Sequence, residues 1–294
     1  MSTALDSRVD LHTHTTASDG GMTPRELVSL AMEVGLDVVA ITDHDTTEAV
    51  PVAIEAAQQT RLTVVPGVEI STLSGQEEIH ILGYFVDLEN KELQGLLAQT
   101  RDARRERAEK MLKRLSSLGF PIEWDHLMQV SGGSHSIGRP HVAVSMLEAG
   151  YVSSYDQAFD LWIGRGKPAY VERLRIPPEE AVRLVRWSRG LPILAHPYFF
   201  SHDGGYRAGL DLQRWLPRLR KAGLAGIEIY YPNYPRSASR RLLDLALKHG
   251  LLITGGSDCH GGVAGSRLGS ITVPWAAWEG LVHRHEQMMK KSAV

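Results

Sequence analysis

The segment Val9-Asp10-Leu11-His12-Thr13-His14 opens with an apolar run that predicts a buried strand, and it ends in two histidines one residue apart. Strand side chains alternate between two faces, so His12 and His14 project to the same side. Two imidazoles held in this way can bind one divalent metal ion. Asp19 follows five residues later, ahead of a glycine pair. This part of the chain therefore predicts a metal site at the end of a strand.

Six further polar side chains lie at or near the ends of later apolar runs. They belong to Thr42–His44, Gly67–Glu69, Ala195–Pro197 and Ser257–His260, and one is the isolated His80. So many imidazoles and carboxylates near predicted strand ends predict a multinuclear metal centre. The nine candidate ligands are His12, His14, Asp19, His44, Glu69, His80, His196, Asp258 and His260.

The composition indicates a globular protein. With 294 residues, of which 43% are hydrophobic, the chain is long enough for one large α/β domain with an insertion or for two small domains. The formal net charge of −2 gives no basic field of the kind that binds nucleic acid in bulk. A single cysteine excludes an intramolecular disulfide, and residues 1–8 contain no apolar signal-peptide core. We therefore expect a cytoplasmic protein with no stretch that is long and apolar enough to cross a bilayer.

Short apolar runs that alternate with helical patterns predict the fold. The first connection is a helix, because Thr23-Pro24-Arg25-Glu26 forms a capping box and Gly35 can end the helix. The alternation predicts a parallel sheet, and seven units favour a closed, distorted (β/α)7 barrel over an open sheet. Catalytic groups of such barrels lie at the C-terminal ends of the strands. The predicted strands are Val9–His12, Val38–Thr42, Thr63–Val68, Ile79–Phe85, Pro192–Ala195, Gly226–Tyr230 and Leu251–Thr254.

The alternation stops between about residues 93 and 171. This stretch is rich in helical pattern and contains the charged run Arg101–Arg114. Pro177-Pro178-Glu179-Glu180 then starts the helix that leads into the fifth strand. We expect the inserted helices to lie over the mouth of the barrel. The expected division is a barrel domain of residues 1–100 and 172–294 with a mostly helical insertion of residues 101–171.

The order of the motifs resembles that of the PHP-domain proteins (polymerase and histidinol phosphatase). The series is Asp-Leu-His-x-His with Asp19, Thr-Asp-His-Asp, Gly-x-Glu, a strand histidine, Ala-His-Pro and Ser-Asp-x-His. It extends over the whole chain, and all nine ligand positions are filled. Ile137–Ala143 and Gly166–Val171 resemble a stand-alone subgroup with a helical insertion. That subgroup includes phosphatases of nucleoside 3′,5′-bisphosphates and 5′-to-3′ exoribonucleases, and histidinol-phosphate phosphatases are more distant relatives.

The resemblance implies three divalent metal ions per chain, with Glu69 as a bridge between the first two. Imidazole and carboxylate ligands suit Mn²⁺, Fe²⁺ or Zn²⁺ better than Ca²⁺ or Mg²⁺, and Mn²⁺ is our first choice. The implied ligand groups are His12, His14, Glu69 and Asp258 for the first ion, Glu69, His80 and His196 for the second, and Asp19, His44 and His260 for the third.

Adjacent cations favour hydrolysis of phosphoesters. Metal-bound water loses its proton near neutral pH, so a hydroxide shared between two ions is a competent nucleophile. The same cations would bind phosphate oxygens and offset the charge that develops during in-line displacement. The leaving oxygen also needs a proton. Asp258 and His260 are the candidate donors, because metal-site residues act as acids in related hydrolases.

Basic side chains, mostly from the insertion, are expected to bind the phosphate. Arg139 is the first candidate, both for catalysis and for substrate binding, because a guanidinium pairs bidentately with phosphate oxygens. Arg165 and Lys167 come next, since glycines beside them allow close backbone approach. His141, two residues after Arg139, and Arg267 complete the expected substrate-binding set.

Three features have both a structural and a functional interpretation. The run Arg101–Lys110 could bind RNA, but its interleaved acids, such as Glu106 before Lys110, favour a solvated helix face. Aromatic residues at 198–200 and 230–234 could stack on a nucleobase or pack at the barrel rim. Cys259 is expected to be a packed thiol, because its side chain points away from those of its neighbours.

The expected function is metal-dependent removal of the 3′-phosphate from a nucleoside 3′,5′-bisphosphate. A 5′-to-3′ exonuclease acting on short RNA or DNA would cut the same ester, and a histidinol-phosphate phosphatase is a further alternative. A non-catalytic nucleotide sensor is the alternative of another class. Structural remnants of PHP domains usually lose ligands, whereas this chain retains all nine. The expected partner is therefore a small phosphorylated nucleotide or a short oligonucleotide, with no obligate protein partner.

Overall fold

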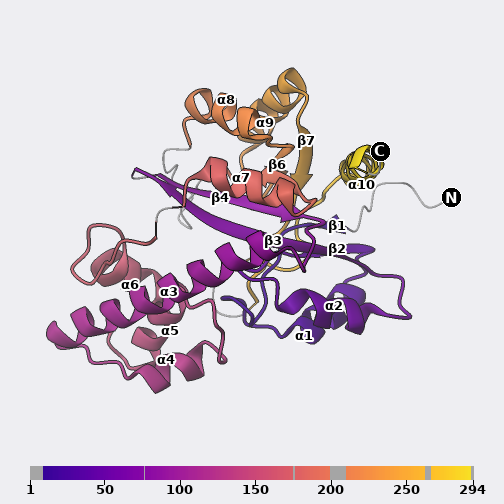
Figure 1. Cartoon of the computed structure of the whole chain (residues 1–294). Coiled ribbons are helices and arrows are strands. Elements are labelled where there is room, and N and C mark those ends of the chain that lie inside the picture. The colour runs from indigo at the N-terminus through magenta and orange to yellow at the C-terminus, as the bar shows by residue number, and fades with distance from the viewer. Residues whose placement is uncertain (1–8, 76, 175, 199–209, 262–265, 293–294) are drawn as a thin grey trace.

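Seven strands form one sheet in the computed structural model, which describes residues 9–75, 77–174, 176–198, 210–261 and 266–292. Neighbours in the sheet follow the order of the chain from β1 to β7, and helices cover the sheet on its outside (Figure 1). The strands are β1 (Val9–Asp10), β2 (Val38–Ile41), β3 (Thr63–Ser74), β4 (Glu77–Tyr84), β5 (Leu191–Leu194), β6 (Gly226–Tyr230) and β7 (Leu252–Gly255).

The two edges of the sheet approach each other, so the sheet is nearly closed into a barrel. The backbone N–H of Leu11, just after β1, donates to the carbonyl of Gly255 at the end of β7, with an N···O distance of 3.3 Å. Further along the same two segments, Thr13 and Cys259 form an isolated parallel β-bridge. A seven-stranded barrel was predicted from the sequence, and the structure confirms it.

One strand runs against the predicted direction. β1 to β3 and β5 to β7 pair in parallel, but β4 is antiparallel to both β3 and β5. β3 ends at Ser74 and β4 begins at Glu77. A parallel crossover needs a dozen or more residues, so a connection of this length can only form a hairpin. The prediction of a uniformly parallel sheet is therefore wrong at β4.

The barrel helices follow from local signals and buried apolar faces. α1 begins with the predicted capping box: Glu26 N–H donates to Thr23 Oγ1 at 3.3 Å, and Thr23 N–H donates to Glu26 Oε2 at 2.8 Å. Gly35 follows the helix with a φ of 80°, which only glycine adopts without strain. The helices around the barrel are α1 (Pro24–Glu33), α2 (Ala49–Ala57), α7 (Pro178–Trp187), α8 (Leu212–Ala222), α9 (Arg236–His249) and α10 (Trp275–Ser292).

The helices between β4 and α7 have a hydrophobic core of their own. Met111, Leu115, Leu127, Val142 and Met146 are buried together there. Figure 1 shows these helices gathered beside the far end of the long β3–β4 hairpin. They are α3 (Lys91–Ser117), α4 (Trp124–Val130), α5 (Arg139–Glu148), α6 (Tyr155–Ala158) and a π-helical turn (Phe159–Ile163).

α3 belongs to both halves of the molecule. Its first turns bury Leu93 and Leu97 in the core of the barrel, whereas Met111 and Leu115 near its end pack into the core of the inserted helices. The expected boundary at residue 101 falls inside this continuous helix. Among the described residues, no helix has the length and apolar character that a bilayer span requires.

Candidate metal centre

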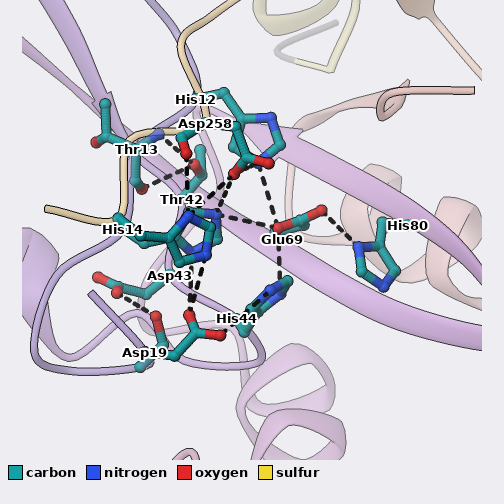
Figure 2. A network of polar contacts seen from close by, with 12 residues as sticks. His12, Thr13, His14, Asp19, Thr42, Asp43, His44, Glu69, His80 and Asp258 are labelled. Carbon is teal, nitrogen blue, oxygen red and sulfur yellow. Dashed lines mark hydrogen bonds and ion pairs between the residues drawn. The ribbon is translucent and has the colours of Figure 1, made fainter. Parts of the chain in front are cut away.

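The nine candidate ligands gather at one end of the barrel. Glu69 and His80 lie within β3 and β4, and the other seven follow β1, β2, β5 and β7. Parallel strands end at the same edge of a barrel, which explains how motifs far apart in the sequence meet. Figure 2 shows Glu69 between the side chains of His12, His14, His44 and His80.

The first ligand group consists of two histidines and two carboxylates. Nε2 of His12 lies 3.2 Å from Glu69 Oε2 and 3.3 Å from Asp258 Oδ1. Nε2 of His14 lies 3.2 Å and 3.1 Å from the same two oxygens. One ligand atom from each residue falls within 4.8 Å of the others. Four nitrogen and oxygen atoms so arranged could surround a single cation.

Glu69 connects this group to the next. Its Oε1 lies 2.8 Å from Nδ1 of His80 and 2.9 Å from Nε2 of His196. His44 Nδ1 lies 3.1 Å from Oε2 of the same carboxylate. Burial alone would raise the pKa of Glu69, but the imidazoles of His44, His80 and His12 hold it well below its usual range. Glu69 is therefore an ionised carboxylate that can bridge two cation positions.

The third group surrounds Asp19. Its Oδ1 lies 3.4 Å from Nε2 of His260 and 3.8 Å from Nδ1 of His14, and its Oδ2 lies 3.9 Å from Nε2 of His44. The second group that the geometry defines is His44, Glu69 and His80, so His14 and His44 each belong to two groups. His196, expected in the second group, contacts Glu69 but falls in none of the three groups among the described residues. The groups are contiguous, as a multinuclear site requires.

The donor set fits divalent metal ions. Several buried nitrogen and oxygen atoms of these residues have no hydrogen-bond partner among the described residues. A buried polar atom without a partner is costly, and a cation at these positions would provide one. The atoms are Nδ1 and Nε2 of His14, Nδ1 of His44, Nε2 of His80, Oδ1 of Asp19 and Oδ1 of Asp258.

Three buried carboxylates outside the candidate ligand set hold the candidate ligands in place. Glu228 Oε1 lies 3.0 Å from Nδ1 of His12, and its Oε2 accepts the backbone N–H of His196 at 2.8 Å. Asp10 accepts the backbone N–H groups of Ser257 and Gly269, each at 2.8 Å. Such contacts fix the orientation of metal ligands.

The third of these carboxylates, Asp43, organises the loop that carries Asp19. It accepts hydrogen bonds from the N–H and hydroxyl of Thr15, at 2.7 and 2.8 Å, and from the hydroxyl of Ser18 at 2.5 Å. The available sequence signal was its place in the Thr-Asp-His-Asp motif. For Glu228 the signal was a lone acid inside an apolar strand, which is costly unless the charge has a partner.

A groove of about 1140 Å³ opens beside the metal centre. Asp19, Asp258 and His260 line it, so the third ligand group faces solvent through this groove. Tyr231 also lines it and donates a hydrogen bond of 2.6 Å from its hydroxyl to Asp258 Oδ2. Asp258 has a φ of 51°, which is uncommon for a residue other than glycine and is typical of functional positions.

The structure separates the predicted substrate-binding residues into three places. His141 and Arg267 line the groove, and His141 Nδ1 accepts the backbone N–H of Gly138 at 3.0 Å. Arg139 lies outside the described groove lining and forms an ion pair of 3.4 Å with Glu78. Arg165 and Lys167 also lie outside that lining, at the exposed end of the inserted helices.

Two of the charged residues of α3 contradict the prediction of a solvated face. Arg104 and Arg107 are buried, 9% and 6% exposed, because Asp45 and Ser71 accept hydrogen bonds from Arg104 and the carbonyl of Val171 accepts one from Arg107. The predicted pair of Glu106 and Lys110 is present on the exposed side, at 3.2 Å. Cys259 is buried among apolar residues, which confirms the prediction of a packed thiol.

The aromatic residues near the barrel rim contact each other and the metal centre. The backbone N–H of Tyr198 donates to the hydroxyl of Tyr234 at 2.9 Å, and the rings of Tyr231 and Tyr234 lie 5.1 Å apart. Residues 199 and 200 lie outside the described residues. Of the described residues among these rim aromatics, Tyr231 lines the groove, and Tyr155 of the inserted helices lines it as well.

The fold is a nearly closed α/β barrel, and His, Asp and Glu side chains cluster at its strand ends. This combination is typical of a metal-dependent hydrolase. Known proteins agree: the PHP domain family matches residues 10–150. The 5′-3′ exoribonuclease Rnm of Salmonella typhimurium is 34% identical over 92% of this chain and 93% of its own length. The 3′,5′-nucleoside bisphosphate phosphatase of Chromobacterium violaceum is 30% identical over 89% and 90%.

A solved structure gives the same result. A protein of Bifidobacterium adolescentis, thought to be a metal-dependent phosphoesterase, superposes with a TM-score of 0.85 at 33% identity. The match covers 95% of this chain and 96% of that one. This chain belongs to the PHP-domain family and is a metal-dependent phosphoesterase, a hydrolase of phosphoric esters.

Proposed function

We propose that this enzyme hydrolyses the 3′-phosphate of nucleoside 3′,5′-bisphosphates, giving the 5′-nucleotide and inorganic phosphate. The observation that carries the proposal is the position of Asp19, Asp258 and His260, which belong to the ligand groups and also line the groove. A phosphate that enters the groove therefore meets the candidate metal centre directly. The Chromobacterium violaceum relative, named for this substrate class, supports the proposal.

The chain's own residues would divide the chemistry between them. Divalent cations held by the three ligand groups, with Mn²⁺ as our first choice, would supply an activated water and offset the charge on the phosphoryl oxygens. Asp258 and His260 face the groove, where either can hold the proton that the leaving oxygen needs. Tyr231, hydrogen-bonded to Asp258, would keep that carboxylate in its orientation.

A 5′-to-3′ exonuclease activity is the second candidate, and the size of the groove favours it. Small-molecule pockets usually enclose about 300–1,000 Å³, and this groove is larger at about 1140 Å³. The Salmonella typhimurium relative is named as an exoribonuclease. Both activities break the P–O bond at the 3′ oxygen and release a 5′-nucleotide. They differ in the other product, which is inorganic phosphate for the phosphatase and the 5′-phosphorylated remaining chain for the exonuclease.

Phosphate release by Mn²⁺-loaded enzyme tests the proposal. The substrates are adenosine 3′,5′-bisphosphate, 3′-AMP, 5′-AMP, histidinol phosphate and a 5′-phosphorylated trinucleotide, with the products identified by mass. We expect the bisphosphate to be the best substrate and 5′-AMP to be its product. Stepwise release of mononucleotides from the trinucleotide at a higher kcat/KM would assign the enzyme as an exonuclease instead.

The Asp258→Ala variant serves as the control, since it removes a ligand that also lines the groove. It should abolish release from every substrate. Preference for histidinol phosphate, or metal-independent binding of the nucleotides without turnover, would overturn the proposal.

A further inference from the structure

A second, narrow pocket lies beside the metal centre, between β3, α3 and residues 173–174. Asp45, Ser71, Arg104, Arg107 and Arg173 line it, and we call it the arginine pocket. Asp45 directly follows the ligand His44, and Ser71 is two residues beyond Glu69 in β3. Strand residues two apart lie on one face and are separated by roughly 7 Å. The arginine pocket is therefore a neighbour of the metal ligands.

One of its arginines already has an anionic partner. Arg104 donates from Nε to Asp45 Oδ2 at 2.7 Å and from Nη2 to Ser71 Oγ at 2.7 Å. Asp45 Oδ1 in turn accepts the backbone N–H of Ser71 at 2.9 Å. Arg104 is thus neutralised and fixed, and it forms a rigid wall of the pocket.

The other arginines outnumber their acidic partners. Arg139 forms an ion pair with Glu78 at 3.4 Å, and Arg173 interacts electrostatically with the same carboxylate. Arg107 donates from Nε to the carbonyl of Val171 at 2.7 Å, which neutralises no charge. Glu78 therefore faces three guanidinium groups, and Asp45, which also attracts Arg173, is already paired with Arg104. Such an excess of largely buried like charge is costly unless an anion offsets it.

Two nitrogens of these side chains are left without partners. Nη2 of Arg107 and Nη1 of Arg173 are buried, and neither has a hydrogen-bond partner among the described residues. Arg107 is 6% exposed, so water satisfies little of its hydrogen-bonding capacity. Both side chains line the arginine pocket, so an anion there would meet donors from α3 and from residue 173.

The electrostatic interactions among these arginines also favour a bound anion. Burial and the positive charges of Arg139, Arg173 and Arg104 lower the pKa of Arg107 to about 9. Guanidinium groups keep their proton in proteins, so the lowered value for Arg107 means that its charge is held at a cost. A bound anion would remove that cost.

We propose that the arginine pocket binds the phosphate of the substrate that is not hydrolysed, an inference that rests on the proposed function. Guanidinium groups match phosphate oxygens in charge and in forked geometry. The pocket measures about 10 Å³, the space of roughly one water molecule, so it admits a terminal phosphate oxygen and excludes a nucleoside.

The test compares Arg107→Gln and Arg173→Gln with a matched control on the same helix. Arg105→Gln is the control, because Arg105 is 62% exposed and pairs with Glu109 across one helical turn. Circular dichroism and thermal melting confirm the fold of each variant. Arg173→Lys is a further variant that keeps the charge and loses the fork, so the test does not depend on one substitution.

The first measurement is the shift in Tm that inorganic phosphate causes in the full chain after chelation, and it requires no turnover. We expect phosphate to stabilise the wild type and Arg105→Gln, and to have little effect on Arg107→Gln and Arg173→Gln. Equal shifts in all four proteins, or no shift in the wild type, would overturn the inference even if the enzyme hydrolyses bisphosphates.

The second measurement is the ratio of kcat/KM for adenosine 3′,5′-bisphosphate to that for 3′-AMP, which lacks the second phosphate. Loss of a charged hydrogen bond should lower this ratio roughly tenfold to a hundredfold in both glutamine variants. An unchanged ratio alongside lost phosphate binding would show a site for free phosphate and overturn the substrate assignment. If the wild type hydrolyses neither nucleotide, the proposed function fails, and the phosphate-binding measurement still tests the pocket.

Discussion

Glu228 Oε1 lies 3.0 Å from Nδ1 of His12, and both side chains are fully buried. An imidazole that donates its Nδ1 proton to a carboxylate keeps Nε2 free as a metal ligand. Nε2 of His12 is the atom that lies beside Glu69 and Asp258 in the first ligand group. Glu228 therefore sets both the tautomer and the direction of His12 without belonging to any ligand group itself.

Glu228→Gln should weaken metal binding. Glutamine preserves the shape but removes the negative charge that orients His12 and makes it more basic, and outer carboxylates of this kind usually contribute 10- to 100-fold in affinity. We expect the Kd for Mn²⁺ to rise at least tenfold, measured by titration of the chelated protein. Glu123→Gln is the control, because the exposed Glu123 caps α4 without a side-chain hydrogen bond. Equal affinity in both variants would contradict an orienting role.

The candidate ligands could be selected from the sequence, whereas for Glu228 the sequence showed only an acid in an apolar strand and not its partners. The spacing of His12 and His14 predicted one shared face. Although β1 ends at Asp10, Nε2 of both histidines lies beside Glu69 and Asp258. Glu228 sits in an apolar strand, and its partners His12 and His196 are distant in sequence. Only the closure of the barrel brings them together. Long-range contacts of this kind leave no periodic signal in a single sequence.

The loss of one carboxylate should remove one metal ion. Asp19 supplies the only carboxylate of the third ligand group among the described residues, and the other members are histidines. Asp19→Ala should therefore lower the Mn²⁺ content by one ion per chain, measured by elemental analysis after gel filtration, and should abolish most activity. Asp125→Ala, on the inserted helix α4, is a control outside the described metal-ligand groups. Full activity with unchanged metal content would rule out a required third site.

The surroundings of α3 show where local patterns were insufficient. The alternation of acids and bases between residues 101 and 110 predicts a solvated helix, and this holds for Glu106 and Lys110. Arg104 and Arg107 are buried because Asp45 and the carbonyl of Val171 accept their hydrogen bonds. Hydropathy places arginine on the surface by default, because a single-residue scale contains no information about a hydrogen-bond partner from another segment. The reversal of β4 has a different cause. The predicted strands end at Val68 and begin again at Ile79, whereas the observed strands extend to Ser74 and from Glu77, which leaves room only for a hairpin.

Removal of the metal ions should lower the thermal stability. A ligand at 100 times its Kd stabilises the native state by about 2.7 kcal/mol. For a chain of this size that corresponds to a fall in Tm of about 5 °C on chelation. Differential scanning calorimetry with EDTA, followed by restoration with excess Mn²⁺, measures the effect. A Tm that does not respond to either step would show that the ligand groups bind no ion that contributes to stability.

The hydroxyl of Tyr231 should matter for turnover rather than for folding. It donates a hydrogen bond of 2.6 Å to Asp258 Oδ2, while Oδ1 of the same carboxylate lies 3.1 Å from His14 Nε2. Tyr231→Phe keeps the ring, which lies 5.4 Å from that of His196, and removes only this hydrogen bond.

A hydrogen bond to a charged group contributes about 1.5–3 kcal/mol, so kcat should fall roughly tenfold or more while KM and the metal content change little. Tyr151→Phe provides the matched control, because its hydroxyl donates to the carbonyl of Pro121 within the inserted helices. If both variants keep the wild-type kcat, Asp258 does not depend on Tyr231 for its orientation. A raised KM with an unchanged kcat would instead place the hydroxyl in substrate binding.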